Sequence, residues 1–317
     1  MNILITGATG FIGRNVAEIL CSEPGHRVVC MVRSKNKADK FLPENTERFF
    51  ADINDQDLAE KLRPYDLDAV FHCSGYVENK NPERLRLINV KGTRNICRLC
   101  LDLKVKRMVY TSSVAVVSGH FNVPLTEDLP YKATNLYGES KIAAEKTVLS
   151  FRRKGLPVSI IRPPMIYGEH EPHLLPVLLK LMKLRLFPVI DNGKNKLHMA
   201  YVKNVAAALV YSLTHDGFLS GTYFAADQEV LTQKQVFSFM ARGIKASLPW
   251  NIPGRLKPCL LRLPGLGSKL YFFLKDRVYS TEKIKALGFI PPYGAEQSLI
   301  KSSKATFGYN LNNDKHR

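Results

Sequence analysis

The sequence has no apolar run that could cross a membrane and no tract of low complexity. Its uninterrupted apolar stretches stay below the roughly 18 residues that a membrane-spanning helix requires. No segment repeats at the intervals of about 20 to 50 residues that mark solenoids and propellers. The chain begins with MNILITGATG, which has neither the basic residues nor the cleavage site of a signal peptide. These absences predict a soluble globular protein, and we expect it to be cytoplasmic.

Acidic residues are scarce relative to basic ones. The chain has 28 Asp and Glu against 46 Lys and Arg, which gives a formal net charge of +18. The excess is concentrated towards the C-terminus, where residues 241–317 contain 14 basic and four acidic side chains. Such a surface suits nucleic acid, anionic lipid or an anionic substrate, or serves only solubility. Because no nucleic-acid-binding module accompanies the charge, we expect no nucleic-acid partner.

Cysteine is also infrequent, with six residues spread over the chain. Cys97 and Cys100 are spaced as CxxC, but no second pair of cysteines or histidines lies at the spacing of a zinc site. The two residues share one face of a predicted helix, so we expect them to pack in the core. We expect His170 and His173, in the segment GEHEPH, to lie in a loop. The sequence therefore predicts no metal site.

What the sequence does contain is a regular alternation of strand-like and helix-like segments. Short runs rich in β-branched residues, such as NILITGA and HRVVCMVR, are separated by single helical segments. This order predicts βαβ units, and hence an α/β fold with a doubly wound parallel sheet of the Rossmann type. We expect residues 1–165 to form this domain and 166–317 to form mainly a smaller, interleaved C-terminal substrate lobe. Residues 197–227 should return to the first domain, beginning with a short strand near His198 that rejoins the sheet.

The segment TGATGFIG joins the first predicted strand to the first predicted helix. Gly7, Gly10 and Gly13 stand three residues apart in it, in the context required of a dinucleotide-binding loop. The first glycine permits a tight turn, the second lets the backbone approach a pyrophosphate, and the third lets the helix pack closely. The phosphates would lie at the free N–H groups of the helix N-terminus. The expected cofactor contacts from this loop are Gly7, Thr9, Gly10, Phe11, Ile12 and Gly13.

Three further segments are candidates for binding the rest of the cofactor. Arg33 follows the second strand, where NAD-selective sites usually have an acid, and an arginine there can pair with a 2′-phosphate. We therefore favour NADP(H), with NAD(H) as the alternative. Asp52 and Ile53 are placed to bind the adenine, although Asp52 suits the cap of the following helix nearly as well. The small residues that would let the cofactor lie close to the fourth strand are Cys73, Ser74 and Gly75.

The segment YGESK places Tyr137 and Lys141 four residues apart on one face of a predicted helix. That helix follows the fifth strand, which ends near Ser112 and Ser113, so a serine and the tyrosine can face one crevice at the carboxyl ends of the strands. A free tyrosine has a pKa of about 10, and a neighbouring ammonium together with a bound nicotinamide would lower that pKa. Such a tyrosine could exchange a proton with a substrate alcohol or ketone.

Taken in order along the chain, these motifs resemble those of the extended short-chain dehydrogenases/reductases, the group that includes NDP-sugar epimerases and dehydratases. The matching segments cover roughly residues 1–230 and are TGATGFIG, DI at 52–53, HCSG, NVKGT at 89–93, YTSSVAV, YGESK, RPPMIYG at 162–168 and YVKNVA at 201–206. The resemblance implies that Tyr137 is the acid/base, and that Lys141 is its electrostatic partner and a ligand of the nicotinamide ribose. The other site residues that it implies are Ser113, which orients the substrate oxygen, Asn89, which supports the site, and Pro163 and Met165, which line the nicotinamide.

The C-terminal part of the chain distinguishes branches of this group. Residues 241–280 are leucine-rich and basic, and they do not resemble the lobe that grips a nucleotide-sugar diphosphate. They resemble the segment found in enzymes of 3β-hydroxysteroids and sterols, and the MVRS ending of the second strand is similar to dihydroflavonol reductases. We therefore expect an NADP(H)-dependent oxidoreductase that interconverts a secondary alcohol and a ketone on an apolar small molecule. The alternatives are an NDP-sugar 4-epimerase or dehydratase and, less in keeping with a complete Ser-Tyr-Lys set, a dinucleotide-binding protein without activity.

The same segment bears on membranes. Its interleaved basic and large apolar residues suit either the cap of the substrate lobe or peripheral contact with the anionic inner face of a membrane. Four prolines, Pro249, Pro253, Pro258 and Pro264, exclude a single spanning helix. The sequence leaves the oligomeric state open, a homodimer included.

Overall fold

The structure, a computed structural model, describes residues 1–256 and 275–314. A seven-stranded sheet in the order β3-β2-β1-β4-β5-β6-β11 forms its centre, and every neighbouring pair of strands is parallel. The strands are β1 (Asn2–Thr6), β2 (Arg27–Val32), β3 (Glu47–Phe50), β4 (Ala69–His72), β5 (Arg107–Thr111), β6 (Val158–Arg162) and β11 (Thr222–Phe224). The predicted doubly wound parallel sheet is confirmed. Its strand order reverses between β1 and β4, the switch point at which such sheets bind ligands.

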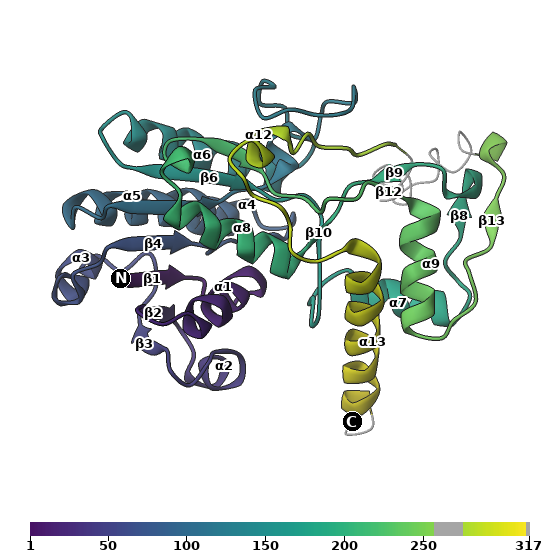
Figure 1. Cartoon of the computed structure of the whole chain (residues 1–317), viewed down its shortest axis with the longest axis horizontal. Coiled ribbons are helices and arrows are strands. Elements are labelled where there is room, and N and C mark those ends of the chain that lie inside the picture. Colours follow the sequence, from purple (N-terminus) through teal and green to yellow (C-terminus); the bar gives the residue numbers. More distant parts are fainter. Residues whose placement is uncertain (257–274, 315–317) are drawn as a thin grey trace.

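Helices cover both faces of this sheet (Figure 1). On one face, α1 (Phe11–Ser22) and α8 (Val202–Thr214) share a hydrophobic core with β1 and β2. On the other face, α3 (Leu58–Leu62), α5 (Thr93–Asp102) and α6 (Leu136–Arg152) pack on the sheet around a second core. The short α2 (Lys35–Phe41) follows β2. Cys97 and Cys100 on α5 have no accessible surface, which confirms the expected core position of this CxxC pair.

A smaller helical lobe lies beside the sheet (Figure 1). It is built on α7 (Leu175–Lys183), α9 (Gln233–Gly243) and α13 (Ala295–Asp314), which contact one another. Their apolar faces form a hydrophobic cluster separate from the two cores of the sheet. The lobe also contains two short strand pairs, β8 (Val189–Ile190) with β13 (Asn251–Ile252), and β9 (Lys196–Leu197) with β12 (Leu231–Thr232). A short helix, α12 (Glu282–Lys285), precedes α13 in the chain and contacts β11.

The expected return of the chain to the sheet near His198 is wrong in detail. The strand at that point, β10 (Ala200–Tyr201), pairs with β7 (Ile166–Tyr167) in a separate two-stranded sheet. The physical reason lies at the end of β6, where Pro163 and Pro164 follow. Neither proline has a backbone N–H, so the ladder of the central sheet cannot continue through them. The strand that does join the central sheet is β11, beside β6.

The helical segment from residue 82 to residue 102 contains an irregular turn. It begins as α4 (Pro82–Leu85), passes through a π-helical segment (Arg86–Gly92) and continues as α5. Such π turns are frequent at functional sites because the extra residue in the turn re-aims the side chains around it. Here the turn contains Asn89, one of the residues that the resemblance implies for the site.

Within the described ranges, no helix combines the length and the apolar character that crossing a bilayer would need. The segment 241–280, expected to be a cap or a membrane contact, is only partly described, because residues 257–274 lie outside those ranges.

Candidate active site

A cavity of 1590 Å³ follows the carboxyl edge of the sheet around the switch point. Its wall is formed by the loop after β1, the end of β2 and the segments after β3 and β4. The predicted cofactor residues that line it are Gly7, Thr9, Gly10, Phe11, Arg33, Asp52, Ile53, Cys73, Ser74 and Gly75. Ligand pockets usually have volumes of about 300–1,000 Å³, so this one has room for a dinucleotide.

Two positions of the glycine loop, Gly7 and Gly13, have no room for a side chain. Gly7 has a φ of +67°, and a Cβ added there would lie 2.7 Å from the backbone N of Ser74. A side chain at Gly7 would therefore push β1 and β4 apart at the switch point. A Cβ at Gly13 would lie 2.3 Å from the carbonyl oxygen of Gly7, so only glycine lets α1 pack directly on the loop.

The N-terminus of α1 fits a phosphate group. Gly10 is its N-cap, and no side chain caps the helix there. The first N–H groups of a helix have no partner within the helix, and the helix dipole makes this end favourable for an anion. Gly10 and Phe11 line the cavity, so these N–H groups meet it at its edge. The loop is thus suited to hold the pyrophosphate of a dinucleotide.

Arg33 and Asp52 lie together at the far end of the cavity. Nη1 of Arg33 is 3.2 Å from Oδ2 of Asp52, and the Arg33 side chain is 66% exposed. Oδ1 of Asp52 accepts hydrogen bonds from the backbone N (2.9 Å) and Nδ2 (3.1 Å) of Asn54. Burial raises the pKa of the Asp52 carboxyl, but the hydrogen bonds from Asn54 and the pairing with Arg33 outweigh it, and the pKa is lowered. Asp52 is therefore an anion that already has partners in the loop and in Arg33.

The candidate catalytic side chains come together beyond the end of β4. Tyr137 and Lys141 lie one turn apart on α6, and the Tyr137 hydroxyl hydrogen-bonds to Ser113, which follows β5. Nζ of Lys141 is buried and donates to the carbonyl oxygen of Thr111 at 2.9 Å. A Cβ at Gly75 would lie 3.7 Å from this Nζ, so Lys141 adjoins the lining of the cavity. The serine, tyrosine and lysine thus form one group at the carboxyl edge of the sheet.

Burial shifts the pKa values of two members of this group. Burial raises the pKa of Tyr137 to about 12, and the hydrogen bond with Ser113 offsets only part of the rise. Burial lowers the pKa of Lys141 to about 8, against the opposing influence of Glu145 and Cys73. The expected lowering of the tyrosine pKa depends on a bound nicotinamide as well as on Lys141, and it stays a prediction; among the protein's own groups, burial is the larger influence. Desolvation of the phenolate exceeds their stabilisation of it.

A buried network of hydrogen bonds connects Lys141 to Thr6, the last residue of β1 before the glycine loop. Nζ of Lys141 lies 3.4 Å from the hydroxyl of Tyr110, which is hydrogen-bonded to Thr93. The Thr93 hydroxyl is 3.0 Å from Nε2 of His72, whose Nδ1 is 2.7 Å from the hydroxyl of Thr6. Burial lowers the pKa of His72 to about 3, so its imidazole is neutral. These hydrogen bonds link the lysine to the strand that leads into Gly7.

Asn89 links the loop after β4 to the catalytic helix. Its Oδ1 accepts from the backbone N of Tyr76 at 2.8 Å, and its Nδ2 donates to the Tyr76 carbonyl at 2.9 Å and to Oγ of Ser140 at 2.8 Å. Ser140 is the residue before Lys141. Asn89 therefore fixes the spacing between the cavity wall and α6, and both N–H donors of its amide are used within the protein.

A buried ion pair supports the same residues from behind. Glu145 lies one turn after Lys141 and has no accessible surface. Its carboxylate accepts from Nε and Nη2 of Arg162 at 2.9 and 2.7 Å, from the Tyr131 hydroxyl at 2.9 Å, and from the Ser112 hydroxyl. Arg162 ends β6, and Ser112 precedes Ser113. The pair therefore holds the ends of β5 and β6 against α6.

Not every predicted cofactor residue lines the cavity. Ile12 packs against an apolar cluster, Gly13 lies against the backbone of Gly7, and Pro163 is buried. Met165 lines a second, narrow and apolar cavity between β7, α7 and α9.

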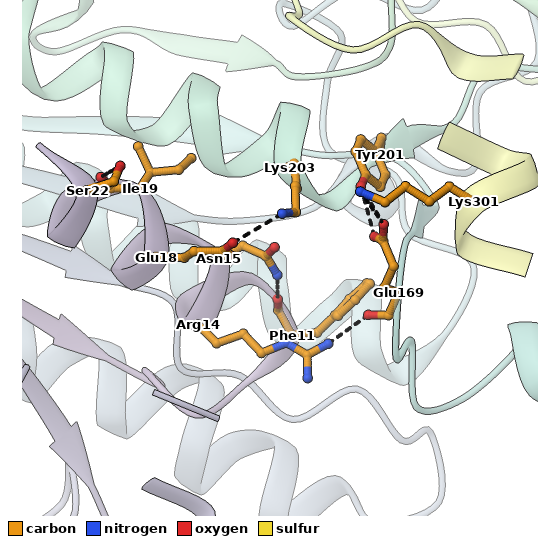
Figure 2. Close-up of polar contacts among 10 residues, drawn as sticks. All are labelled: Phe11, Arg14, Asn15, Glu18, Ile19, Ser22, Glu169, Tyr201, Lys203 and Lys301. Carbon is orange, nitrogen blue, oxygen red and sulfur yellow. Dashed lines mark hydrogen bonds and ion pairs between the residues drawn. The ribbon is translucent and has the colours of Figure 1, made fainter. Parts of the chain in front are cut away.

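Residues at the mouth of the large cavity were missed by the sequence analysis (Figure 2). Nη2 of Arg14 on α1 donates to the carbonyl oxygens of Glu169 and His170, at 2.9 and 3.3 Å. The Glu169 carboxylate accepts from the Tyr201 hydroxyl at 2.8 and 2.9 Å and lies 3.3 Å from Nζ of Lys301 on α13. These contacts tie the phosphate end of α1 to the C-terminal helix. Arg14 could have been identified by its position one turn after Gly10, but nothing local in the sequence brings Lys301 here.

Among the described residues, no group of three or more His, Cys, Asp and Glu side chains is arranged to hold a metal ion. His170 lies in the loop after β7, with a φ of +62°.

Comparisons with known proteins agree with this architecture. The profile of the NAD dependent epimerase/dehydratase family matches residues 3–224. The chain is 30% identical to the 3 beta-hydroxysteroid dehydrogenase/Delta 5-->4-isomerase of Mycobacterium tuberculosis, over 94% of this chain and 88% of that protein. It is 27% identical to the N-acetyl-alpha-D-glucosaminyl-diphospho-ditrans,octacis-undecaprenol 4-epimerase of Escherichia coli O157:H7, over 96% and 95% of the two chains. Among solved structures, the UDP-glucuronic acid 4-epimerase of Bacillus cereus with NAD superposes with a TM-score of 0.80 at 18% identity, covering 98% and 99% of the two chains.

Proposed function

The chain belongs to the NAD dependent epimerase/dehydratase family, and from this premise we propose that it is an NADP(H)-dependent oxidoreductase acting on an apolar secondary alcohol or ketone. That it is a nicotinamide-dependent enzyme of the extended short-chain dehydrogenase/reductase type follows from the family and its relatives. The observation that carries the proposal is the grouping of Ser113, Tyr137 and Lys141 beside the dinucleotide cavity. The substrate class, the reaction type and the preference for NADP(H) are the proposed parts.

Each residue of the group has a distinct role. The bound nicotinamide would supply or accept the hydride. Tyr137 would donate its hydroxyl proton to the substrate oxygen when a ketone is reduced, and would take it back in the reverse direction. The Ser113 hydroxyl, already bonded to Tyr137, would bind the same substrate oxygen and orient it. The Lys141 ammonium would stabilise the negative charge that develops on Tyr137, since opposite charges at close range favour the ionised form.

The wall beside Met165 supports an apolar substrate. The residues that line the second cavity are Met165, Ile166, Tyr167, Glu171, Leu174, Leu175, Leu178, Leu197, Met199, Val236, Phe237 and Met240. None of them is a lysine or arginine that could pair with a diphosphate. The one charged side chain, Glu171, accepts from the backbone N–H groups of His173, Leu174 and Leu175 and so caps α7. The cavity measures only 20 Å³, so the support comes from the character of the wall and not from its volume.

The second candidate is a sugar 4-epimerase. It is favoured by the near full-length similarity to an enzyme of a lipid-linked sugar and by the fold shared with nucleotide-sugar epimerases. The same serine, tyrosine and lysine would serve such a reaction, in which the sugar is oxidised transiently and the cofactor is returned unchanged.

Cofactor stoichiometry separates the two candidates. The protein would be mixed with excess NADPH and a 3-oxosteroid, and separately with UDP-glucose and with UDP-N-acetylglucosamine. The oxidoreductase proposal predicts that the absorbance of reduced nicotinamide falls with the ketone, one equivalent for each product molecule. Epimerised sugar formed without any change in absorbance, together with no reaction of the ketone, would refute the proposal in favour of the second candidate.

Cofactor preference tests the role of Arg33. The change Arg33→Ala should weaken NADPH binding by roughly 10- to 100-fold, since hydrogen bonds to charged groups contribute about 1.5–3 kcal/mol, and should leave NADH binding nearly unchanged. The measurement is titration of both cofactors by calorimetry. Arg63→Ala, an exposed arginine of the short helical turn after α3, is the control. Wild-type protein that binds NADH as tightly as NADPH would show that Arg33 has no role in selectivity.

The pH dependence tests the role of Lys141. With a pKa of about 8, this group is an ammonium below that pH and a neutral amine above it. In the ketone-reducing direction, kcat/KM should therefore fall as the pH rises through about 8, because the charge developing on Tyr137 loses its neighbour. Lys141→Met should be slow, and its kcat/KM should not fall near pH 8. Lys146 is an exposed lysine on the same helix, and Lys146→Met should retain the fall. This role would be contradicted if kcat/KM fell only near the ordinary lysine pKa of about 10.4, or if the fall near pH 8 persisted in Lys141→Met.

A further inference from the structure

Two loops of the helical lobe expose large apolar side chains next to each other. Leu184 and Leu186 follow α7, and Leu248 and Trp250 precede β13. Their exposed fractions are 57%, 63%, 58% and 54%. Single exposed apolar residues are common on protein surfaces, but a contiguous group of them marks a contact site. We call these four residues the apolar patch.

The apolar patch is built into the fold. Nε1 of Trp250 donates to the carbonyl oxygen of Arg185 at 3.2 Å, and Nη2 of Arg185 donates to Oγ of Ser247 at 2.9 Å. The backbone N of Val189 donates to the Trp250 carbonyl at 2.9 Å, which continues the pairing of β8 with β13. These bonds hold the two loops side by side and leave the indole ring outside. The exposure of Trp250 is thus imposed by its own hydrogen bonds.

The charge around the apolar patch is mainly positive. The two segments that carry it, 174–190 and 242–256, contain no acidic residue, and their basic residues are Lys180, Lys183, Arg185, Arg242, Lys245 and Arg255. Two acidic side chains reach these segments from outside them: Asp191 lies against Gly254, and Glu296 pairs with Arg242. Nζ of Lys183 donates to the carbonyl oxygens of Ile244 and Lys245, at 3.3 and 3.1 Å, so this cation joins the two loops. Lys180 lies one turn before Leu184 on the same helical face. An anionic partner therefore fits this surface.

We propose that the apolar patch docks on the surface of an anionic lipid bilayer, with Trp250 at the level of the headgroups. Tryptophan and leucine surrounded by lysine and arginine is the composition that suits the boundary between headgroups and acyl chains. A second copy of the chain fits less well, because a symmetric contact would place the cations of these segments, apart from Arg242 with its partner Glu296, against one another. This proposal does not depend on the proposed function, since a bilayer contact can be measured without any substrate.

The protein carries its own probe for this contact, because Trp250 is the one tryptophan of the chain. Its fluorescence would be followed as vesicles are added, made either of phosphatidylcholine alone or of an equal mixture with phosphatidylglycerol. We expect a blue shift with the anionic vesicles at low salt, a reversal as salt is added, and quenching when the acyl chains are brominated. An emission maximum that stays unchanged by anionic vesicles at low salt would overturn the proposal.

Variants separate the apolar and the basic contributions. Leu186→Ser with Leu248→Ser should weaken vesicle binding, whereas Ile290→Ser, which is 68% exposed outside the two loops, should not. Changing Lys180, Lys183 and Lys245 to glutamine should lower the binding constant by about 100-fold, since each basic residue near an anionic surface contributes roughly fivefold. The matched control changes three exposed cations of the sheet domain, Arg63, Lys104 and Lys154. If both sets of changes lowered the vesicle binding constant equally, binding would depend only on net charge, and a specific patch would be refuted.

Sedimentation velocity without vesicles tests the competing occupant. The proposal predicts that Leu186→Ser with Leu248→Ser leaves the oligomeric state unchanged. A dimer in the wild type that this variant dissociates would assign the apolar patch to a second copy of the chain and overturn the membrane proposal.

Discussion

Replacement of Tyr137 by phenylalanine is expected to reduce turnover by roughly 10²–10⁴-fold while leaving cofactor affinity close to that of the wild type. The change removes the transferable proton and keeps the ring, so the packing of α6 is retained. The Ser113 hydroxyl loses this partner but still accepts from the backbone N of Ala115 at 3.2 Å, so the cost is small beside the lost proton transfer. The measurement is kcat for ketone reduction together with the Kd for NADPH.

The control for this variant is Tyr65→Phe. Tyr65 lies in the short helical turn after α3 and its hydroxyl is bonded to Glu47, away from the cavity. It should show wild-type turnover. A Tyr137→Phe protein with near-normal kcat would show that the proton comes from another group, and the proposed site would then be wrong.

Among the changes considered, removal of the Glu145 carboxylate is expected to lower the free energy of unfolding most. Glu145→Ala leaves the Arg162 guanidinium, with 5% of its side chain exposed, without its counter-ion. Breaking a buried ion pair by removing one partner typically costs about 3–5 kcal/mol, because the remaining charge is buried and unpaired. The free energy of unfolding would be measured by urea denaturation. The exposed pair of Arg27 and Glu47 provides the comparison, and Glu47→Ala should cost less than about 1 kcal/mol.

A double variant distinguishes loss of the pair from loss of volume. Glu145→Leu with Arg162→Met removes both charges and keeps apolar bulk, and buried pairs replaced in this way often lose little or no stability. We expect it to regain most of the stability lost in Glu145→Ala. A double variant as unstable as the single one would mean that the hydrogen bonds to Tyr131 and Ser112 matter more than the charge pair.

Local patterns in the sequence predicted the first half of the fold. The spacing of Gly7, Gly10 and Gly13 after an apolar strand fixed the position of the dinucleotide cavity, because the steric needs of that loop depend on residues next to each other in the chain. The alternation of strands and helices predicted the parallel sheet in the same way. The group of Ser113, Tyr137 and Lys141 could be foreseen because α6 is the next α-helix in the chain after β5.

Features that depend on distant contacts could not be read from the sequence. The pairing of β10 with β7 depends on where Pro163 and Pro164 stop the central ladder, and β10 itself looks like any short strand. Lys301 reaches the cavity only because α13 packs on α7 and α9. The apolar patch joins Leu186 to Trp250, and only the second of these lies in the segment that the sequence analysis singled out.

The effect of burial on the Tyr137 pKa could not be read from the sequence for a related reason. The sequence showed the lysine four residues away, and an adjacent cation lowers a tyrosine pKa. It did not show how deeply the hydroxyl is buried, nor that Lys141 directs its hydrogen bonds to Thr111 and Tyr110. In the folded chain, burial is the larger influence on Tyr137.

The fate of the transferred hydride tests the central proposal most directly. The protein would be mixed with one equivalent of NADPH carrying deuterium at the reactive position of the nicotinamide and with an excess of a 3-oxosteroid, and the products would be examined by mass spectrometry. The proposal predicts that the deuterium appears on the carbinol carbon of the released alcohol, with one equivalent of NADP⁺ formed. A parallel sample would contain a UDP-hexose in place of the ketone. The proposal would be contradicted if the deuterium remained on the cofactor in the presence of the ketone and the UDP-hexose were epimerised without net oxidation of the cofactor.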